Sequence, residues 1–134
     1  MVMKIAICAP AGPFQPEDAE RVRSLAAGHD GVSLHFHPQC FFSDGHFAGT
    51  DAQRLAAFLE CANDPAFDAV WFARGGYGSN RIAQEAIAGL GPEAADKQYL
   101  GYSDCGYLLA GLYRAGLGRP IHAPMPADIR RAGG

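Results

Sequence analysis

The sequence predicts an α/β fold in which a parallel β-sheet carries helices on both faces. Short apolar segments alternate along the chain with longer amphipathic segments, which is the pattern of consecutive βαβ units. One of the short segments, 68–73, is almost continuously apolar, as is typical of a strand covered on both faces of a parallel sheet. The 134 residues are enough for one domain with a single core.

Five segments are predicted strands. The first is apolar and ends at a loop with two prolines, which cannot continue a ladder of strand hydrogen bonds. In the second, Val32, Leu34 and Phe36 alternate with polar residues, which indicates a strand with one polar face. The predicted strands span residues 3–8, 32–36, 68–73, 98–102 and 120–122.

Four segments are predicted helices. The first begins at Pro16 and has acidic residues in its first turn, where proline and negative charge are favoured. The second has an apolar face that includes Leu55 and Phe58. The predicted helices span residues 16–27, 51–63, 79–90 and 104–115. We therefore predict one domain over residues 1–124, whereas residues 125–134 show no core pattern and are predicted to begin a linker to a further domain.

Composition excludes several classes of function. The formal net charge of −3 provides no basic field, so neither nucleic acid nor an anionic membrane is an expected partner. No apolar run approaches the roughly 20 residues of a membrane helix, and the amino terminus lacks the apolar core of a signal peptide. We therefore expect a cytoplasmic protein.

Cysteine and histidine spacing gives no sign of a metal site. The four cysteines are irregularly spaced and contain no Cys-x-x-Cys pair, so reduced thiols are expected rather than a disulfide framework or a structural zinc site. A metal site can be drawn from residues that lie close in sequence, but their spacing is not that of zinc ligands. These residues are His35, His37, Cys40 and His46. No metal and no cofactor is expected.

The sharpest candidate for chemistry is a serine at a strand-to-helix turn. In such sheets ligands bind beyond the carboxyl ends of the strands, and Ser103 follows the fourth predicted strand in Gly-Tyr-Ser-Asp. A serine at this position can be a nucleophile, with amides at the helix start to stabilise an oxyanion. The pattern departs from Gly-x-Ser-x-Gly because Cys105 takes the place of the second glycine. The alternative is that Ser103 or Asp104 only caps the fourth helix.

A glycine-rich loop follows the third predicted strand, in the sequence Arg-Gly-Gly-Tyr-Gly-Ser from Arg74 to Ser79. Glycines let the backbone approach a ligand closely, the helix start favours an anion, and Arg74 can bind a carboxylate. No Gly-Lys-Ser/Thr follows, so the loop is not a Walker A motif. We expect Ser79 to be the N-cap of the third helix, whether or not the loop is functional. His122 ends the last predicted strand and could be a base, a substrate contact or a structural residue.

Four segments in this order resemble the LD-carboxypeptidases (muramoyltetrapeptide carboxypeptidases) and their relatives, the microcin C immunity peptidases. They are K-I-A-I-C-A-P-A-G-P, F-A-R-G-G-Y-G-S-N-R-I, Y-L-G-Y-S-D-C-G-Y-L-L-A and P-I-H-A-P-M. The pair R-G-G-Y-G-S and G-Y-S-D, on successive βα turns, is far more specific than either motif alone. The resemblance covers nearly the whole chain.

The resemblance implies a flavodoxin-like parallel sheet related to the class I glutamine amidotransferase fold. It also implies a serine hydrolase of cell-wall recycling that releases the terminal D-alanine from a small peptide substrate, a murein tetrapeptide or a related conjugate. Ser103 matches the nucleophile, and the amide of Asp104 with the turn at Gly75 and Gly76 matches the oxyanion hole. The substrate contacts that the motifs suggest are Arg74, Tyr77 and His122.

The chain departs from the family pattern in three ways. Ala11 replaces a serine of the first loop, and Ala123 replaces the glycine of a His-Gly-Pro motif; both are exchanges between small residues. The family's catalytic glutamate and histidine lie in a carboxyl-terminal domain, and His122 matches a different motif. We therefore expect that the chain is part of a longer protein or of a divided gene, that it is nearly inactive alone, and that it can form a homodimer.

Two alternatives remain open from the sequence. The first is a non-catalytic flavodoxin-like module whose glycine loop binds an anion or a nucleotide. The second is a cysteine-dependent relative of the amidotransferases that uses Cys105, although this residue lies two positions after the turn and is expected to begin the helix interior.

Overall fold

The sheet is parallel throughout, and its strand order is β2-β1-β3-β4-β5. A computed structural model describes residues 2–129 of the chain. The strands are β1 (Met3–Cys8), β2 (Val32–Phe36), β3 (Ala69–Phe72), β4 (Gln98–Gly101) and β5 (Arg119–His122). This order is the flavodoxin-like one, so the predicted fold class is confirmed.

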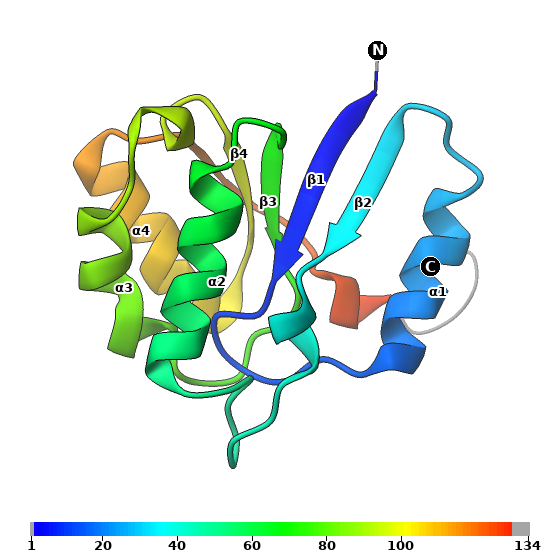
Figure 1. Cartoon of the computed structure of the whole chain (residues 1–134), viewed down its shortest axis with the longest axis horizontal. Helices are drawn as coiled ribbons and strands as arrows, with labels where there is room; N and C mark the ends of the chain where they lie inside the picture. The colour runs from blue at the N-terminus through cyan, green and yellow to red at the C-terminus, as the bar shows by residue number, and fades with distance from the viewer. Residues whose placement is uncertain (1, 130–134) are drawn as a thin grey trace.

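Helices cover both faces of the sheet, as Figure 1 shows. They are α1 (Pro16–Ala26), α2 (Asp51–Asn63), α3 (Ser79–Ala88) and α4 (Gly106–Ala115). In the figure α2, α3 and α4 lie on one side of the strands and α1 lies on the other. No helix among residues 2–129 is long and apolar enough to cross a bilayer.

The core has two parts, one on each face of the sheet. The larger cluster joins β1, β3 and β4 to α2, α3 and α4, with Phe58, Phe72 and Leu108 fully buried. The smaller cluster joins β1 and β2 to α1 through Ile7, Val22 and neighbouring residues. Burial of apolar area on both sides explains why β3 reads as an apolar run rather than an alternating one.

The boundaries of α2 agree with the predicted 51–63, and a capping box explains its start. The Thr50 hydroxyl accepts a hydrogen bond from the Gln53 amide at 3.1 Å, and the Gln53 side chain accepts one from the Thr50 amide at 2.9 Å. The fourth helix differs from the prediction, because residues Ser103–Cys105 form a 3₁₀ turn and α4 begins only at Gly106. The left-handed backbone of Ser103 excludes this residue from the α-helix.

Residues 125–129, predicted to begin a linker, pack against the domain. Met125 and Pro126 are buried, and the amide of Ala127 donates to the carbonyl of Ala73 at 3.0 Å. Arg21 on α1 donates to the carbonyl of Ile129 at 3.1 Å. Met125 belongs to the larger core cluster, and Ala127 and Ile129 pack against the smaller one, so apolar contacts and hydrogen bonds together anchor this segment. Residues 130–134 of the predicted linker lie outside the described part of the chain.

Candidate active site

The loops after β1 and β3 meet at the point where the strand order changes direction. The chain leaves β1 toward α1 on one face and leaves β3 toward α3 on the other. In folds of this type, ligands bind at this point, beyond the carboxyl ends of the strands. Here the amide of Gly12 donates to the carbonyl of Gly75 at 3.0 Å. A Cβ atom on Gly12 would lie only 2.9 Å from that oxygen, so this contact requires glycine.

Ser103 stands on a strained turn directly after β4. Its φ is 59°, and no other non-glycine residue among residues 2–129 has a positive φ. The left-handed conformation costs about 1–2 kcal/mol for a residue with a Cβ atom. The turn leaves the Ser103 side chain exposed at the carboxyl edge of the sheet. Strain of this kind at an exposed serine is typical of a nucleophile turn.

The glycine loop lies against this serine. A Cβ atom on Gly75 would be 3.2 Å from the Ser103 Cβ and 3.3 Å from its Oγ. Within residues 2–129 the amides of Gly75 and Gly76 donate no hydrogen bond. The amide of Asp104 is among the first of the 3₁₀ turn, which have no partner inside the turn. N–H groups from two loops are therefore available beside the Ser103 hydroxyl.

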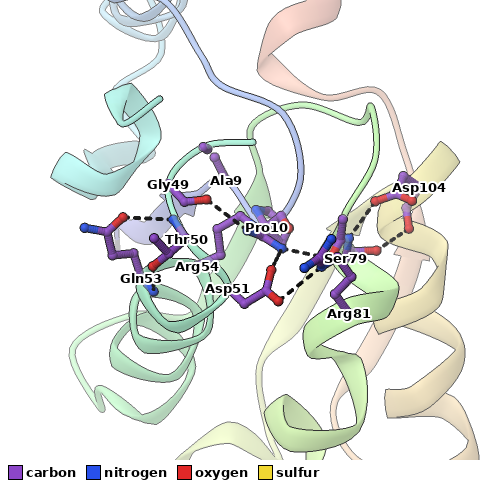
Figure 2. A network of polar contacts seen from close by, with 12 residues as sticks. Ala9, Pro10, Gly49, Thr50, Asp51, Gln53, Arg54, Ser79, Arg81 and Asp104 are labelled. Atoms are coloured by element: carbon purple, nitrogen blue, oxygen red, sulfur yellow. Dashed lines mark hydrogen bonds and ion pairs between the residues drawn. The ribbon is translucent and has the colours of Figure 1, made fainter. Parts of the chain in front are cut away.

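Asp104 ties the serine turn to the start of α3. Its carboxylate accepts a hydrogen bond from the Ser79 amide at 2.8 Å, and its carbonyl accepts one from the Ser79 hydroxyl (Figure 2). The expectation that Ser79 is the N-cap of α3 is therefore wrong: Gly78, with φ 125°, is the N-cap, and Asp104 supplies the missing acceptor from another loop. Neither Ser103 nor Asp104 caps α4 with its side chain.

Arg74 and Tyr77 border the same site. The Arg74 side chain is exposed and donates to the carbonyl of Pro13 at 3.0 Å, so it lies across the loop after β1. Tyr77 is 53% exposed, and its ring centroid lies 5.8 Å from that of Phe47. Both side chains are therefore exposed on the loop that follows β3.

His122 lies at the end of β5 and contacts Tyr102 instead of Ser103. The two ring centroids are 5.6 Å apart, and both rings line a shallow hollow of about 340 Å³. Within residues 2–129 no hydrogen bond joins Ser103 to a histidine or a carboxylate. The described part of the chain thus presents a nucleophile turn without a base in contact.

Cys105 is unsuited to nucleophilic chemistry. It has no exposed surface, and its thiol donates to the carbonyl of Arg74 at 3.4 Å. Burial, with a smaller contribution from Asp104, raises the pKa of Cys105 well above its usual value. A thiol that remains protonated is a weak nucleophile, so the geometry favours Ser103 over Cys105.

The histidines near β2 have other partners. His37 hydrogen-bonds to Glu60 and accepts a hydrogen bond from the Gln39 amide at 3.0 Å. His35 stacks against Phe67, with ring centroids 5.4 Å apart. Among the described residues no three histidine, cysteine or acidic side chains converge on one point.

Two buried polar residues behind the site were not predicted from the sequence. Gln39 bonds through its side chain to the backbone of Ala9 and to the carbonyl of Ala48. Arg54 is 1% exposed and bonds to three separate loops (Figure 2). The sequence does contain a sign that Arg54 is buried. It precedes Phe58 by one helical turn and so lies on the apolar face of α2.

Comparison with known proteins places this geometry in a family. Residues 5–123 match the LD-carboxypeptidase N-terminal domain. A protein of Streptomyces coelicolor named as a carboxypeptidase is 37% identical over 94% of this chain and 41% of its own length. The murein tetrapeptide carboxypeptidase of Pseudomonas aeruginosa is 30% identical over 94% of this chain and 40% of its own length. The chain thus spans about two fifths of the length of these relatives.

Solved structures agree. The muramoyltetrapeptide carboxypeptidase from Oxalobacter formigenes has a TM-score of 0.75 and 25% identity, over 92% of this chain and 40% of that one. The microcin C7 self immunity protein in complex with aspartyl sulfamoyl adenosine has a TM-score of 0.69 and 25% identity, over 87% of this chain and 35% of that one. With the motifs, the sheet order and the strained serine in place, these matches show that the chain belongs to the LD-carboxypeptidase family, through its N-terminal domain.

Proposed function

We propose that this chain is the nucleophile-bearing domain of a serine LD-carboxypeptidase and that Ser103 is the nucleophile. The observation that carries the proposal is the left-handed backbone of an exposed Ser103, with Gly75 packed against its side chain. A merely structural serine would gain nothing from this strain, whereas a nucleophile is held out of the sheet edge by it. The proposed substrate is a murein tetrapeptide or a related conjugate, consistent with the names of two relatives.

In the proposed reaction the Ser103 hydroxyl attacks the carbonyl carbon of the bond to the terminal D-alanine. The proton of the hydroxyl passes to a base, and the carbonyl oxygen becomes an oxyanion that accepts hydrogen bonds from the amides of Asp104 and Gly76. Collapse of the tetrahedral intermediate releases D-alanine, whose nitrogen takes up the proton, and leaves an acyl group on Ser103. Water then hydrolyses the acyl-enzyme and restores the serine.

The free carboxylate of the terminal D-alanine needs a cation, and we assign this role to Arg74. Its side chain is exposed and already anchored across the loop after β1. A guanidinium can bind a carboxylate with two parallel hydrogen bonds. Tyr77 and His122 are the further substrate contacts that we propose, because both rings are exposed at the carboxyl edge of the sheet.

The base and its orienting carboxylate belong, in this proposal, to the region that the longer relatives have beyond the matched part. Among residues 2–129 no base contacts Ser103. The isolated chain of 134 residues should therefore release very little D-alanine, because a serine without its base is a poor nucleophile. Rapid release by the purified chain would contradict this.

Cytoplasmic location and homodimer formation remain predictions.

Labelling with a fluorophosphonate probe tests the nucleophile directly. The longest gene product that contains this chain is compared with its Ser103→Ala variant, with Cys105→Ala as a control. Labelling that disappears only in Ser103→Ala would establish an activated serine, and D-alanine release from a murein tetrapeptide would then test the substrate. A folded full-length protein that does not label would instead favour a non-catalytic binding module.

A further inference from the structure

Arg54 is a buried cation at a position where its charge is energetically unfavourable. Its side chain is fully buried, yet among residues 2–129 its charge is paired with a single carboxylate, that of Asp51, at 2.7 Å. Burial of a charged group is costly unless the group is paired and hydrogen-bonded. Arg54 also lies in the first turn of α2, where the helix dipole disfavours a cation. Helix stability alone therefore does not account for an arginine here.

The contacts of Arg54 are directed at the loops of the active site. Its Nε donates to the carbonyl of Pro10 at 3.0 Å, in the loop after β1. Its two terminal nitrogens donate to the carbonyl of Gly49 at 2.9 Å and to that of Gly78 at 3.1 Å. Figure 2 shows Arg54 close to Asp51, Gly49 and Pro10, with Ser79 at the start of α3 and Asp104 on the turn after β4 next to it. Three carbonyl oxygens thus accept charge-assisted hydrogen bonds from one guanidinium.

Arg54 and the glycine loop are in close contact. A Cβ atom on Gly78 would lie 3.1 Å from an Arg54 nitrogen and 2.8 Å from the Phe47 ring. The guanidinium carbon in turn lies 4.8 Å from the Phe47 ring centroid, in a cation–π contact. The loop thus packs directly against the guanidinium, and this contact blocks a shift of the loop toward α2.

Two hydrogen bonds anchor the glycine loop, one on each side of the Gly76 amide. At one end the Gly75 carbonyl accepts a hydrogen bond from the Gly12 amide, and at the other end the Gly78 carbonyl accepts one from Arg54. In the trans peptide between Gly75 and Gly76 the N–H points opposite to the C=O. The Gly76 N–H is therefore directed away from Gly12, and its orientation depends on both anchors.

We propose that Arg54 is a positioning residue that holds the glycine loop at the distance from Ser103 that an oxyanion hole requires. It does so by joining the loop after β1 and the loop after β3 through one rigid, planar set of donors. Lysine cannot reproduce this, because an ammonium group lacks the fixed fork of five N–H groups. The catalytic part of this inference depends on Ser103 being the nucleophile, whereas the effect on the loop does not.

The first experiment measures the loop itself. Amide hydrogen exchange is followed in the chain of 134 residues for the wild type, Arg54→Lys and Arg54→Met, with Arg81→Met as the matched control. Arg81 also contacts Asp51 and the Phe47 ring but is exposed and bonds to none of the three carbonyls. We expect exchange of the Gly12 and Ser79 amides to rise about tenfold or more in the Arg54 variants and to stay unchanged in Arg81→Met.

The second experiment measures the consequence for the nucleophile. Fluorophosphonate labelling of the longest gene product should slow about 100-fold in Arg54→Lys and remain within about twofold in Arg81→Met, because small errors in catalytic geometry cost this much. If the wild type does not label but the loop exchange rises, the proposed function fails and the positioning role stands. If exchange and labelling in Arg54→Lys match the wild type, the positioning role is wrong.

A loss of global stability can be told apart from a loss of positioning. Global unfolding would raise exchange in β1 and β3 as well as in the loop, whereas loss of the anchor raises it only at the loop amides. Should Arg54→Met fail to fold, Arg54→Lys decides, because it retains the charge opposite Asp51. A variant that folds and exchanges faster in all strands equally would overturn the inference.

Discussion

At Ser103 the backbone adopts a conformation that its own side chain disfavours. A φ of 59° is comfortable for glycine and strained for a residue with a Cβ atom. Two hydrogen bonds hold the turn in place: the Ser79 amide donates to the Asp104 carboxylate, and the Cys105 thiol donates to the Arg74 carbonyl. The strain therefore resides in the native state and can be measured by substitution.

We predict that Ser103→Gly is more stable than Ser103→Ala by about 1 kcal/mol. Both variants lack the hydroxyl, so their difference reports the backbone strain, reduced by the larger conformational entropy of glycine in the unfolded chain. Urea unfolding, monitored by circular dichroism, gives the two free energies of unfolding. A Ser103→Ala variant that is more stable than Ser103→Gly would show that the turn is not strained.

Gly75 is a second residue at which the presence or absence of a Cβ atom should affect the site. We predict that Gly75→Ala slows fluorophosphonate labelling of Ser103 at least tenfold, because the new Cβ would lie 3.3 Å from the Ser103 Oγ and displace it. Gly106→Ala is the control, since no heavy atom lies within 4 Å of the corresponding Cβ and its φ is helical at −57°. This control should label normally and be more stable by about 0.5–1 kcal/mol. Normal labelling of Gly75→Ala would remove Gly75 from the site.

At the scale of elements, α3 begins without a capping side chain of its own. Its N-cap is Gly78, and the acceptor for the Ser79 amide comes from Asp104, on the turn after β4. Parallel strands end at the same edge of the sheet, so a side chain on one βα turn can cap the helix that follows a neighbouring turn. One carboxylate thus links the stability of α3 to the geometry at Ser103.

We predict that Asp104→Ala lowers the free energy of unfolding by about 1 kcal/mol, the usual value of a helix cap, and also slows labelling of Ser103. Asp104→Asn should retain most of both, because the amide oxygen can still accept from the Ser79 amide. Asp96→Ala is a suitable control, since the Asp96 side chain is exposed and makes no hydrogen bond within residues 2–129. Equal effects of Asp104→Asn and Asp104→Ala would exclude the capping role.

For the whole molecule, the four cysteines report on integrity of the core. Each has at most 2% of its surface exposed, and they are distributed over both core clusters. Burial raises the pKa of Cys40 to about 12, and a hydrogen bond with Cys61, together with burial, raises that of Cys8. All four thiols are therefore inaccessible, and the raised pKa keeps the thiols of Cys8, Cys40 and Cys105 protonated at neutral pH.

We predict that all four cysteines react only slowly with a thiol reagent in the native protein at pH 7 and react rapidly in urea. The slow reaction of the native protein should follow the rate of global unfolding and should therefore accelerate in destabilised variants such as Asp104→Ala. The measurement is a time course of absorbance with an aromatic disulfide reagent. Immediate reaction of one thiol in the wild type would show that one cluster opens locally.

The acid side of the stability profile depends on Asp51. Its hydrogen bond with Arg54, and a second one with Arg81, lower the pKa of this carboxyl below its ordinary value of about 4. The unfolded state then binds more protons than the native state in this range. The stabilisation is therefore fully present above about pH 4 and is lost as the pH falls through the lower native pKa.

We predict that Asp51→Asn unfolds with a weaker dependence on pH below about 4 than the wild type does. The change should be modest, because Asp51 is 44% exposed and solvent screens the pair. Thermal unfolding midpoints between pH 2.5 and 6 give the comparison. The same slope in both proteins would show that Asp51 does not contribute to acid unfolding.

Much of the fold was predictable because its determinants are local in the sequence. The apolar run of β3, the capping box before α2 and the alternation in β2 each require only neighbouring residues. The boundary at Pro124 was less informative, because residues 125–129 attach to the domain through contacts with residues distant in the sequence, such as the hydrogen bond from the Ala127 amide to the Ala73 carbonyl. Such bonds have no signature in an apolar pattern.

The sequence by itself determined the order of elements, the parallel sheet and the family, because hydrophobic period and motif spacing are properties of consecutive residues. Only the tertiary structure decided that Gly75 lies against Ser103, that Asp104 caps α3 and that Arg54 gathers three loops. These contacts depend on which strand ends meet at the sheet edge and on backbone carbonyls, which are chemically alike in every residue. A contact of that kind can be read only once the chain is folded.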